Sequence, residues 1–186
     1  MAPSNGKFVI DAVTGDVVEE VPNGGVLVHA CNCIGNWGAG VALHLKKHFP
    51  EAYKLQYEYC QERTHEELMG SCLVILPQDE DSKAIGKEVY IACLFTSHGY
   101  GRKNSKTKNP GLSKKADVLT ATKTALEDLR KQLDQLHSKG ESDRVLEITS
   151  VKFNAGSFKV PWEETQLQIE EAFKDYGGTW IVVSPK

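Results

Sequence analysis

The sequence predicts a single α/β domain in which helices cover both faces of a β-sheet. Short apolar runs bounded by turn residues recur along the chain and are typical of buried strands. Segments with helical periodicity lie between them, and the clearest has apolar or small residues at alternating spacings of three and four between Leu119 and Leu136. The length of 186 residues is enough for one domain with a sizeable core, so we expect residues 1–186 to form one domain.

The apolar runs predict six strands, at residues 8–10, 26–30, 72–76, 89–94, 145–148 and 180–183. A helix is expected from about Gly40 to Phe49, where Pro50 should stop it, and another after Pro161 through Phe173. Residues 99–111 are expected to form a mobile basic loop, because they hold no acid but carry Arg102, Lys103, Lys106 and Lys108. This loop is either simply solvated or a lid that faces a phosphate.

Composition narrows the classes of function. The net charge of −3 argues against a general nucleic-acid binder, and no apolar run is long enough to span a membrane. Residues 1–7 lack the apolar core of a secretory signal, so we expect a cytoplasmic protein, with the nucleus as a second location. Five cysteines predict reduced, buried thiols. Because only Cys31 and Cys33 lie close in sequence, we expect no metal site, and no cofactor.

The most informative segment follows the second expected strand. Gly35, Gly38 and Gly40 fall within six residues, and a helical pattern begins at once. Glycine lets the backbone approach a ligand, and the helix then directs free N–H groups at an anion. A helix terminus alone contributes about 0.3–1 kcal/mol, whereas each hydrogen bond to a charged oxygen adds about 1.5–3 kcal/mol. A diphosphate therefore suits the loop better than a carboxylate; the alternative is a turn that only allows close helix–strand packing.

Familiar phosphate-handling motifs are absent. Val41 and Ala42 stand where a P-loop needs lysine and a hydroxyl residue, and Leu43 stands where the dinucleotide-binding motif needs glycine. No cysteine is followed by arginine six positions later, and Asp79–Asp81 is expected to be an acidic surface turn.

Two further segments complete a candidate site. Residues 15–17 place an acid after the first strand, and residues 154–160 offer backbone donors after the fifth strand.

These segments resemble the signatures of the macrodomain family. The matching stretches are Gly15-Asp16-Val17, His29-Ala-Cys-Asn32-Cys, Trp37-Gly-Ala-Gly40-Val-Ala42 and Asn154 through Trp162. Within the family the chain looks most like the fungal ADP-ribose 1''-phosphate phosphatases, and the resemblance extends from about Lys7 to Val183. It implies a three-layer α/β/α fold with a central mixed sheet. Lys152-Phe153, Lys159 and the long basic loop depart from the expected pattern.

The resemblance also implies roles for individual residues. Asp16 would hold the adenine amino group, Asn32 would face the distal ribose, and the loops at residues 37–42 and 154–160 would surround the phosphates. The complete set expected to bind substrate is Gly15, Asp16, Val17, Ala30, Cys31, Asn32, Trp37, Gly38, Ala39, Gly40, Val41, Ala42, Asn154, Ala155, Gly156, Ser157, Phe158, Lys159 and Val160.

The implied activity is metal-independent hydrolysis of ADP-ribose 1''-phosphate, a by-product of transfer-RNA splicing, by a monomer. The predicted catalytic residues are His29, which would carry a proton since an imidazole titrates near pH ~6.5, and Asn32, which would orient a ribose hydroxyl or a water. His98 is the reserve for the proton, and His29 is alternatively a strand-end histidine bonded to the backbone. Two other functions stay open: a non-catalytic reader of ADP-ribose, and an ADP-ribosyl glycohydrolase, which the absence of an acid in residues 157–159 disfavours.

Overall fold

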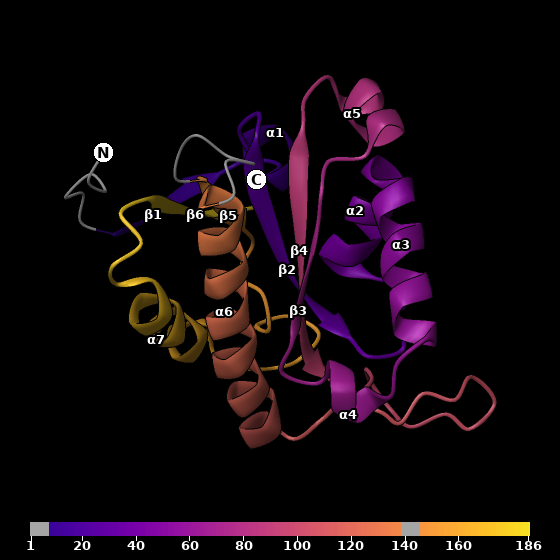
Figure 1. Cartoon of the computed structure of the whole chain (residues 1–186). Coiled ribbons are helices and arrows are strands. Elements are labelled where there is room, and N and C mark those ends of the chain that lie inside the picture. The colour runs from indigo at the N-terminus through magenta and orange to yellow at the C-terminus, as the bar shows by residue number, and fades with distance from the viewer. Residues whose placement is uncertain (1–7, 139–145) are drawn as a thin grey trace.

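The computed structural model describes residues 8–138 and 146–186, in which six strands form one mixed sheet (Figure 1). The strand order is β1-β6-β5-β2-β4-β3, and all neighbours are parallel except β3 and β4, which are antiparallel. The strands are β1 (Val9–Thr14), β2 (Gly25–Asn32), β3 (Cys72–Ile75), β4 (Val89–Ser97), β5 (Ile148–Ser150) and β6 (Thr179–Ser184).

Helices cover both faces of this sheet, which confirms the predicted three-layer fold. The long helix α6 (Lys115–Ser138) and α7 (Trp162–Phe173) lie on one face, and α2 (Gly40–His48) and α3 (Pro50–Gln61) lie on the other (Figure 1). Three short helices join the second layer: α1 (Val17–Glu20), α4 (His65–Leu68) and α5 (Asp79–Ile85). Among residues 8–138 and 146–186, none of the helices combines the length and the hydropathy that a membrane span requires.

Strand β2 contributes to both cores because its side chains alternate between the two faces. Leu27 and Cys31 belong to the core under α2 and α3, whereas Val26 and Val28 belong to the core under α6 and α7. All four are at most 2% exposed. Burial on both faces explains why this strand has a continuous apolar run in the sequence instead of an alternating one.

The helix expected from about Gly40 to Phe49 ends before Pro50, as predicted. Helix α2 stops at His48, but Pro50 is the first residue of α3, a helix that the sequence analysis missed. Proline suits this position, because its fixed φ is helical and the first turn needs no N–H donor.

The expected acidic surface turn at residues 79–81 is wrong. Asp81 is only 3% exposed and lies in α5. Its carboxylate accepts hydrogen bonds from the amides of Glu51 (3.1 Å) and Ala52 (3.0 Å), which are in the first turn of α3. Asp81 therefore caps a helix that begins about 30 residues earlier, and no local pattern could reveal that partnership.

Asn109 organises the base of the basic loop. Its amide nitrogen donates to the carbonyls of Tyr100 (2.8 Å) and Arg102 (3.2 Å), and its Oδ1 accepts from the amides of Tyr100 and Gly111. Residues 101–108 are exposed and project from the body of the molecule near α4 (Figure 1). The predicted mobility of this loop stays a prediction. One end of the fifth expected strand, residue 145, lies outside the described residues.

Candidate functional site

The carboxyl ends of β2 and β5 form a topological switch point. These two strands are parallel neighbours, with Val28 paired to Ser150. The chain leaves β2 toward α2 on one face of the sheet and leaves β5 toward α7 on the other. Loops that diverge in this way open a crevice where ligands bind in α/β sheets. The segments after β1, β2 and β5, which the sequence analysis selected, all leave this carboxyl edge.

Asn32 shapes the loop that follows β2. Its Oδ1 accepts hydrogen bonds from the amides of Ile34 (3.2 Å) and Asn36 (3.1 Å), and its Nδ2 donates to the Asn36 carbonyl (2.8 Å). Asn32 is 7% exposed. These contacts use both ends of the amide, so in this structure Asn32 holds the loop in place; its predicted contact with the distal ribose is still a prediction.

The loop then presents its backbone at the start of α2. Gly38, Ala39 and Gly40 are exposed, and Gly40 has a left-handed φ of 55°. No side chain caps the helix, and its first turn holds no acid. The first amides of α2 are therefore available to an anion, which the positive end of the helix dipole also favours.

Asn154 anchors the second loop. It has a φ of 63° and is 4% exposed. Its Oδ1 accepts a hydrogen bond from the Thr96 hydroxyl, and its Nδ2 donates to the Thr122 hydroxyl, both at 2.9 Å. The side chain thus ties the loop after β5 to β4 and α6. Beyond this anchor, Gly156, Ser157 and Lys159 are exposed, and Lys159 also has a left-handed φ, of 56°.

Asp16 lies at the end of β1 and contacts α2. Its Oδ1 accepts a hydrogen bond from the Val18 amide at 2.8 Å, and its Oδ2 is 2.8 Å from Nε2 of His44. Burial alone would raise the pKa of Asp16, but His44 and the amides of Val18 and Glu19 together hold this pKa below its usual value. The carboxylate is therefore ionised and 38% exposed, as an acceptor for an amino group would need to be. Nothing local in the sequence indicated that His44 would lie there.

His29 lies inside the core and is fully buried. Its ring packs edge-on against Trp37, with 4.5 Å between centroids, and its Nε2 is 3.4 Å from Sγ of Cys31 and 3.6 Å from Sγ of Cys93. Direct contact with a substrate would require the Trp37 loop to open. The catalytic role of His29 therefore stays a prediction, and its neighbours are thiols in place of the backbone partner considered above.

The other predicted binding residues divide by exposure. Val17, Cys31, Trp37, Phe158 and Val160 are buried and pack in the cores that support the loops. Those with exposed backbone are better placed to touch a ligand. They are Gly38, Ala39, Gly40, Gly156, Ser157 and Lys159. The partly buried remainder is Gly15, Ala30, Val41, Ala42 and Ala155.

A pair of imidazoles lies at the same carboxyl edge of the sheet. His98 directly follows β4, is partly exposed, and stacks on His65 of α4 with 5.8 Å between ring centroids. The His98 amide donates to the hydroxyl of Ser113 at 2.9 Å. The sequence analysis did not select His65, because α4 reaches the end of β4 only in the folded structure.

The structure brings together three potential metal ligands that the sequence analysis did not group, and the expectation of no metal site stays a prediction. His29, Cys31 and Cys93 each have a potential ligand atom within 4.8 Å of the others. Spacing along the sequence could not predict this group, because Cys93 comes from β4, beside His29 on β2.

The prediction of reduced, buried thiols is confirmed, since all five cysteines are free and buried. Burial raises the pKa of Cys33 and of Cys60 to about 12.

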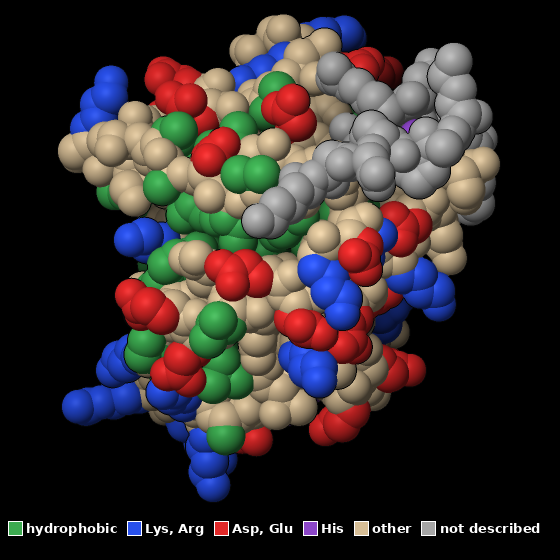
Figure 2. All heavy atoms as spheres, turned by 90° about the vertical axis from the view of Figure 1, so that its left-hand side faces the viewer, with side chains coloured by type: hydrophobic (Ala, Val, Ile, Leu, Met, Phe, Trp, Pro, Cys, Tyr) green, Lys and Arg blue, Asp and Glu red, His purple; other side chains and the backbone are tan. Residues whose placement is uncertain are grey.

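A hollow elsewhere on the molecule does not suit a phosphate. Phe8 and Ile10 lie across a groove from Gln166 and Glu170 of α7 and from Lys174, which directly follows this helix. Apolar side chains gather in the groove (Figure 2). Its wall contains the acid Glu170 and no glycine-rich backbone, so it lacks the array of donors that a diphosphate needs.

Comparison with known proteins agrees with this geometry. The Macro domain family profile matches residues 28–108. The chain is 34% identical to an ADP-ribose 1''-phosphate phosphatase of Neosartorya fischeri, over 88% of this chain and 90% of the relative. It is 37% identical to one of Meyerozyma guilliermondii, over 78% and 83%. The macrodomain of Mycobacterium tuberculosis DarG has the same fold, with a TM-score of 0.67 at 20% identity over 96% of this chain and 99% of that chain. The chain therefore belongs to the macro domain family and is similar, within it, to the fungal ADP-ribose 1''-phosphate phosphatases.

Proposed function

We propose that the protein hydrolyses ADP-ribose 1''-phosphate to ADP-ribose and inorganic phosphate. This proposal rests on the convergence of the glycine-rich loop after β2, the loop after β5 and the ionised Asp16 at one edge of the sheet. The substrate joins an adenine to a diphosphate and a phosphorylated ribose, and these parts call for an acceptor and two sets of donors. The phosphatase names of relatives over most of the chain support the reaction.

Each part of the substrate has a matching group. The Asp16 carboxylate accepts a hydrogen bond from the adenine amino group, and the uncapped amides at the start of α2 bind the diphosphate. The exposed backbone at Gly156 and Ser157 supplies donors to the remaining phosphate oxygens. Charged acceptors strengthen each of these bonds, to about 1.5–3 kcal/mol.

The chemistry needs charge stabilisation and one proton transfer. Fixed backbone N–H groups can stabilise the negative charge that develops on the leaving phosphate, at little reorganisation cost. Two imidazoles compete for the proton: His29, which is fully buried beneath Trp37, and His98, which is partly exposed. The reaction needs no metal ion, because backbone donors replace one at the phosphate.

The burial of His29 favours a second candidate, a non-catalytic reader of ADP-ribose. A reader would use the same loops and the same acid, and it would release its ligand unchanged. Turnover therefore separates the two functions, whereas binding does not.

The decisive experiment measures phosphate release from ADP-ribose 1''-phosphate in the presence of a strong chelator. His29→Ala and His98→Ala should be compared with His137→Ala, which changes an exposed histidine near the end of α6. Release that survives chelation and collapses in one of the first two variants supports the phosphatase and assigns the proton. Binding of ADP-ribose without release supports the reader. Failure to bind ADP-ribose at all overturns both functions.

A further inference from the structure

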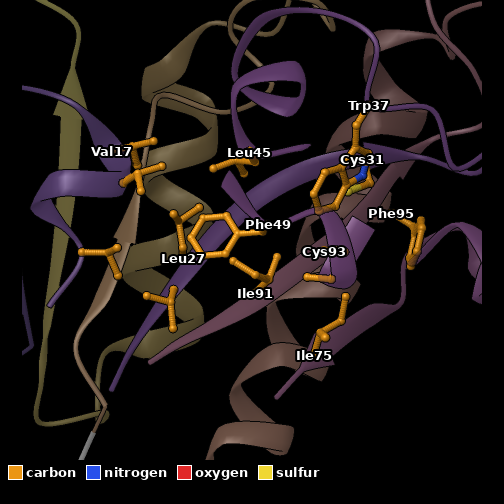
Figure 3. Close-up of a cluster of buried hydrophobic side chains, with 14 of the residues drawn as sticks. Val17, Leu27, Cys31, Trp37, Leu45, Phe49, Ile75, Ile91, Cys93 and Phe95 are labelled. Atoms are coloured by element: carbon orange, nitrogen blue, oxygen red, sulfur yellow. The ribbon is translucent and has the colours of Figure 1, made fainter. Parts of the chain in front are cut away.

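We propose that His29, Cys31 and Cys93 form a binding site for one thiophilic metal ion, Zn²⁺ or Cu⁺. Among residues 8–138 and 146–186, these three side chains place one potential ligand atom each within 4.8 Å of the others. The site lies in the core beneath the Trp37 loop (Figure 3 shows Trp37, Cys31 and Cys93 in this cluster). It goes beyond the proposed phosphatase activity and does not depend on it.

The arrangement follows directly from strand geometry. His29 and Cys31 are two residues apart on β2, so their side chains point to the same face of the sheet. Cys93 is the register partner of His29 on the adjacent strand β4. Cys31 and Cys93 both pack in the core under α2 and α3. Regular backbone thus holds all three ligands, which makes the site rigid.

The distances between donor atoms already suit a bound ion. Nε2 of His29 is 3.4 Å from Sγ of Cys31 and 3.6 Å from Sγ of Cys93. Zinc bonds of about 2.3 Å to sulfur and about 2.0–2.1 Å to nitrogen, at tetrahedral angles, separate these donors by about 3.5 Å. An ion could therefore bind with little movement of the two strands.

The chemistry of the donors selects the kind of ion. Two thiols and an imidazole, without a carboxylate, are soft ligands that favour Zn²⁺ and Cu⁺ over Mg²⁺ or Ca²⁺. All three residues are at most 2% exposed. Two thiolates neutralise a divalent ion in this dry environment, and their protons are released to solvent on binding. Three protein donors satisfy Cu⁺, whereas Zn²⁺ would take one further small ligand.

Metal binding would change the role of His29. Nε2 of His29 lies near both sulfur atoms, so a bound ion would occupy this nitrogen and prevent it from accepting a proton. In the loaded protein, His98 would remain as the other candidate for the proton transfer of the proposed reaction. The ion would also join β2 to β4 directly below Trp37, whose ring rests on the imidazole.

The test uses the reduced, metal-free full chain under anaerobic conditions. Zn²⁺ is titrated in competition with a chromophoric zinc chelator, and Cu⁺ in competition with a Cu⁺-specific chelator, so the two arms identify the ion. We expect equimolar binding of one ion, and an X-ray absorption spectrum with two sulfur neighbours and one imidazole nitrogen. Binding should also raise the melting temperature.

Cys93→Ala is the test variant and Cys72→Ala is its matched control. Both cysteines are buried and lie on the neighbouring strands β3 and β4, but Cys72 is outside the ligand group. Cys93→Ala should lose equimolar binding, and Cys72→Ala should keep it. The proposal is refuted if the protein takes neither ion from its chelator, or if both variants bind the ion as the wild type does. Should Cys93→Ala fail to fold, the wild-type spectrum decides, because a first shell without sulfur refutes the proposal.

Discussion

His44 and Asp16 join two parts of the candidate site, with Nε2 of the imidazole 2.8 Å from Oδ2 of the carboxylate. Asp16 lies at the end of β1 and His44 lies on α2, the helix that starts from the glycine-rich loop. The contact therefore connects the group expected at the adenine to the helix expected at the diphosphate. It also means that His44 and an adenine amino group would share one carboxylate.

The pKa of Asp16 should respond to His44. This pKa lies below its usual value of 3.8, so the carboxylate stabilises the folded state above that pH, and the stabilisation is lost as the pH falls further. In His44→Ala the pKa of Asp16 should rise, because burial raises this pKa and only the backbone hydrogen bonds from Val18 and Glu19 would remain to lower it. An NMR titration of the Asp16 carboxyl carbon measures the change; an unaltered pKa would show that His44 contributes nothing.

Asp16→Ala should weaken ADP-ribose binding by about tenfold or more, the effect of one lost bond to a charged acceptor. His44→Ala should instead leave affinity unchanged or increase it, since the carboxylate is freed. Isothermal titration calorimetry of both variants checks this pair of outcomes. Equal losses in the two variants would mean that His44 itself contacts the ligand.

Gly40→Ala should destabilise the fold by about 1 kcal/mol, because a residue with a side chain is strained in the left-handed region. Gly86→Ala is the matched control, since both glycines have positive φ and a new Cβ at either would meet nothing within 4 Å. Urea unfolding should show a similar decrease in the free energy of unfolding for the two variants. Only Gly40→Ala should also change the affinity for ADP-ribose. A change of affinity in both would point to a general effect of instability.

Gly156→Ala should separate folding from binding. A Cβ there meets nothing within 4 Å, and the φ of Gly156 is not positive, so stability should stay within about 0.5 kcal/mol of wild type. If the Gly156 backbone lies against a phosphate, the added methyl should weaken binding by about tenfold, or 1.4 kcal/mol. Paired thermal melts and ligand titrations measure both quantities. Unchanged affinity would place the phosphate away from this loop.

Asn154→Gly should lower the free energy of unfolding by about 1–3 kcal/mol. The substitution removes the hydrogen bonds to Thr96 and Thr122 and leaves these buried hydroxyl groups without those partners. Glycine keeps the left-handed φ accessible, so the loss reports on the side chain and not on backbone strain. Thr122→Val removes one of the two bonds and should cost less. Denaturant unfolding of the two variants tests this order, and a reversed order would contradict the bridging role.

Local patterns in the amino-acid sequence were enough to predict the segments that form the layers and the loops with exposed backbone. Apolar runs and the stripe of α6 are local signals, and they predicted all six strands and that helix to within a few residues. Gly38 and Gly40 indicated where the backbone is exposed before α2, because glycine reports a backbone requirement at its own position.

The contacts between side chains of different elements could not be predicted in this way, because they depend on how the elements pack. Cys93 lies beside His29 through the register of β2 and β4, Asp81 caps a helix about 30 residues earlier, and His44 reaches Asp16 from another element. The burial of His29 depends in the same way on the packing of Trp37 above it. Periodicity describes one segment and the face that it buries, whereas these contacts join separate segments, so their geometry is set when the layers pack.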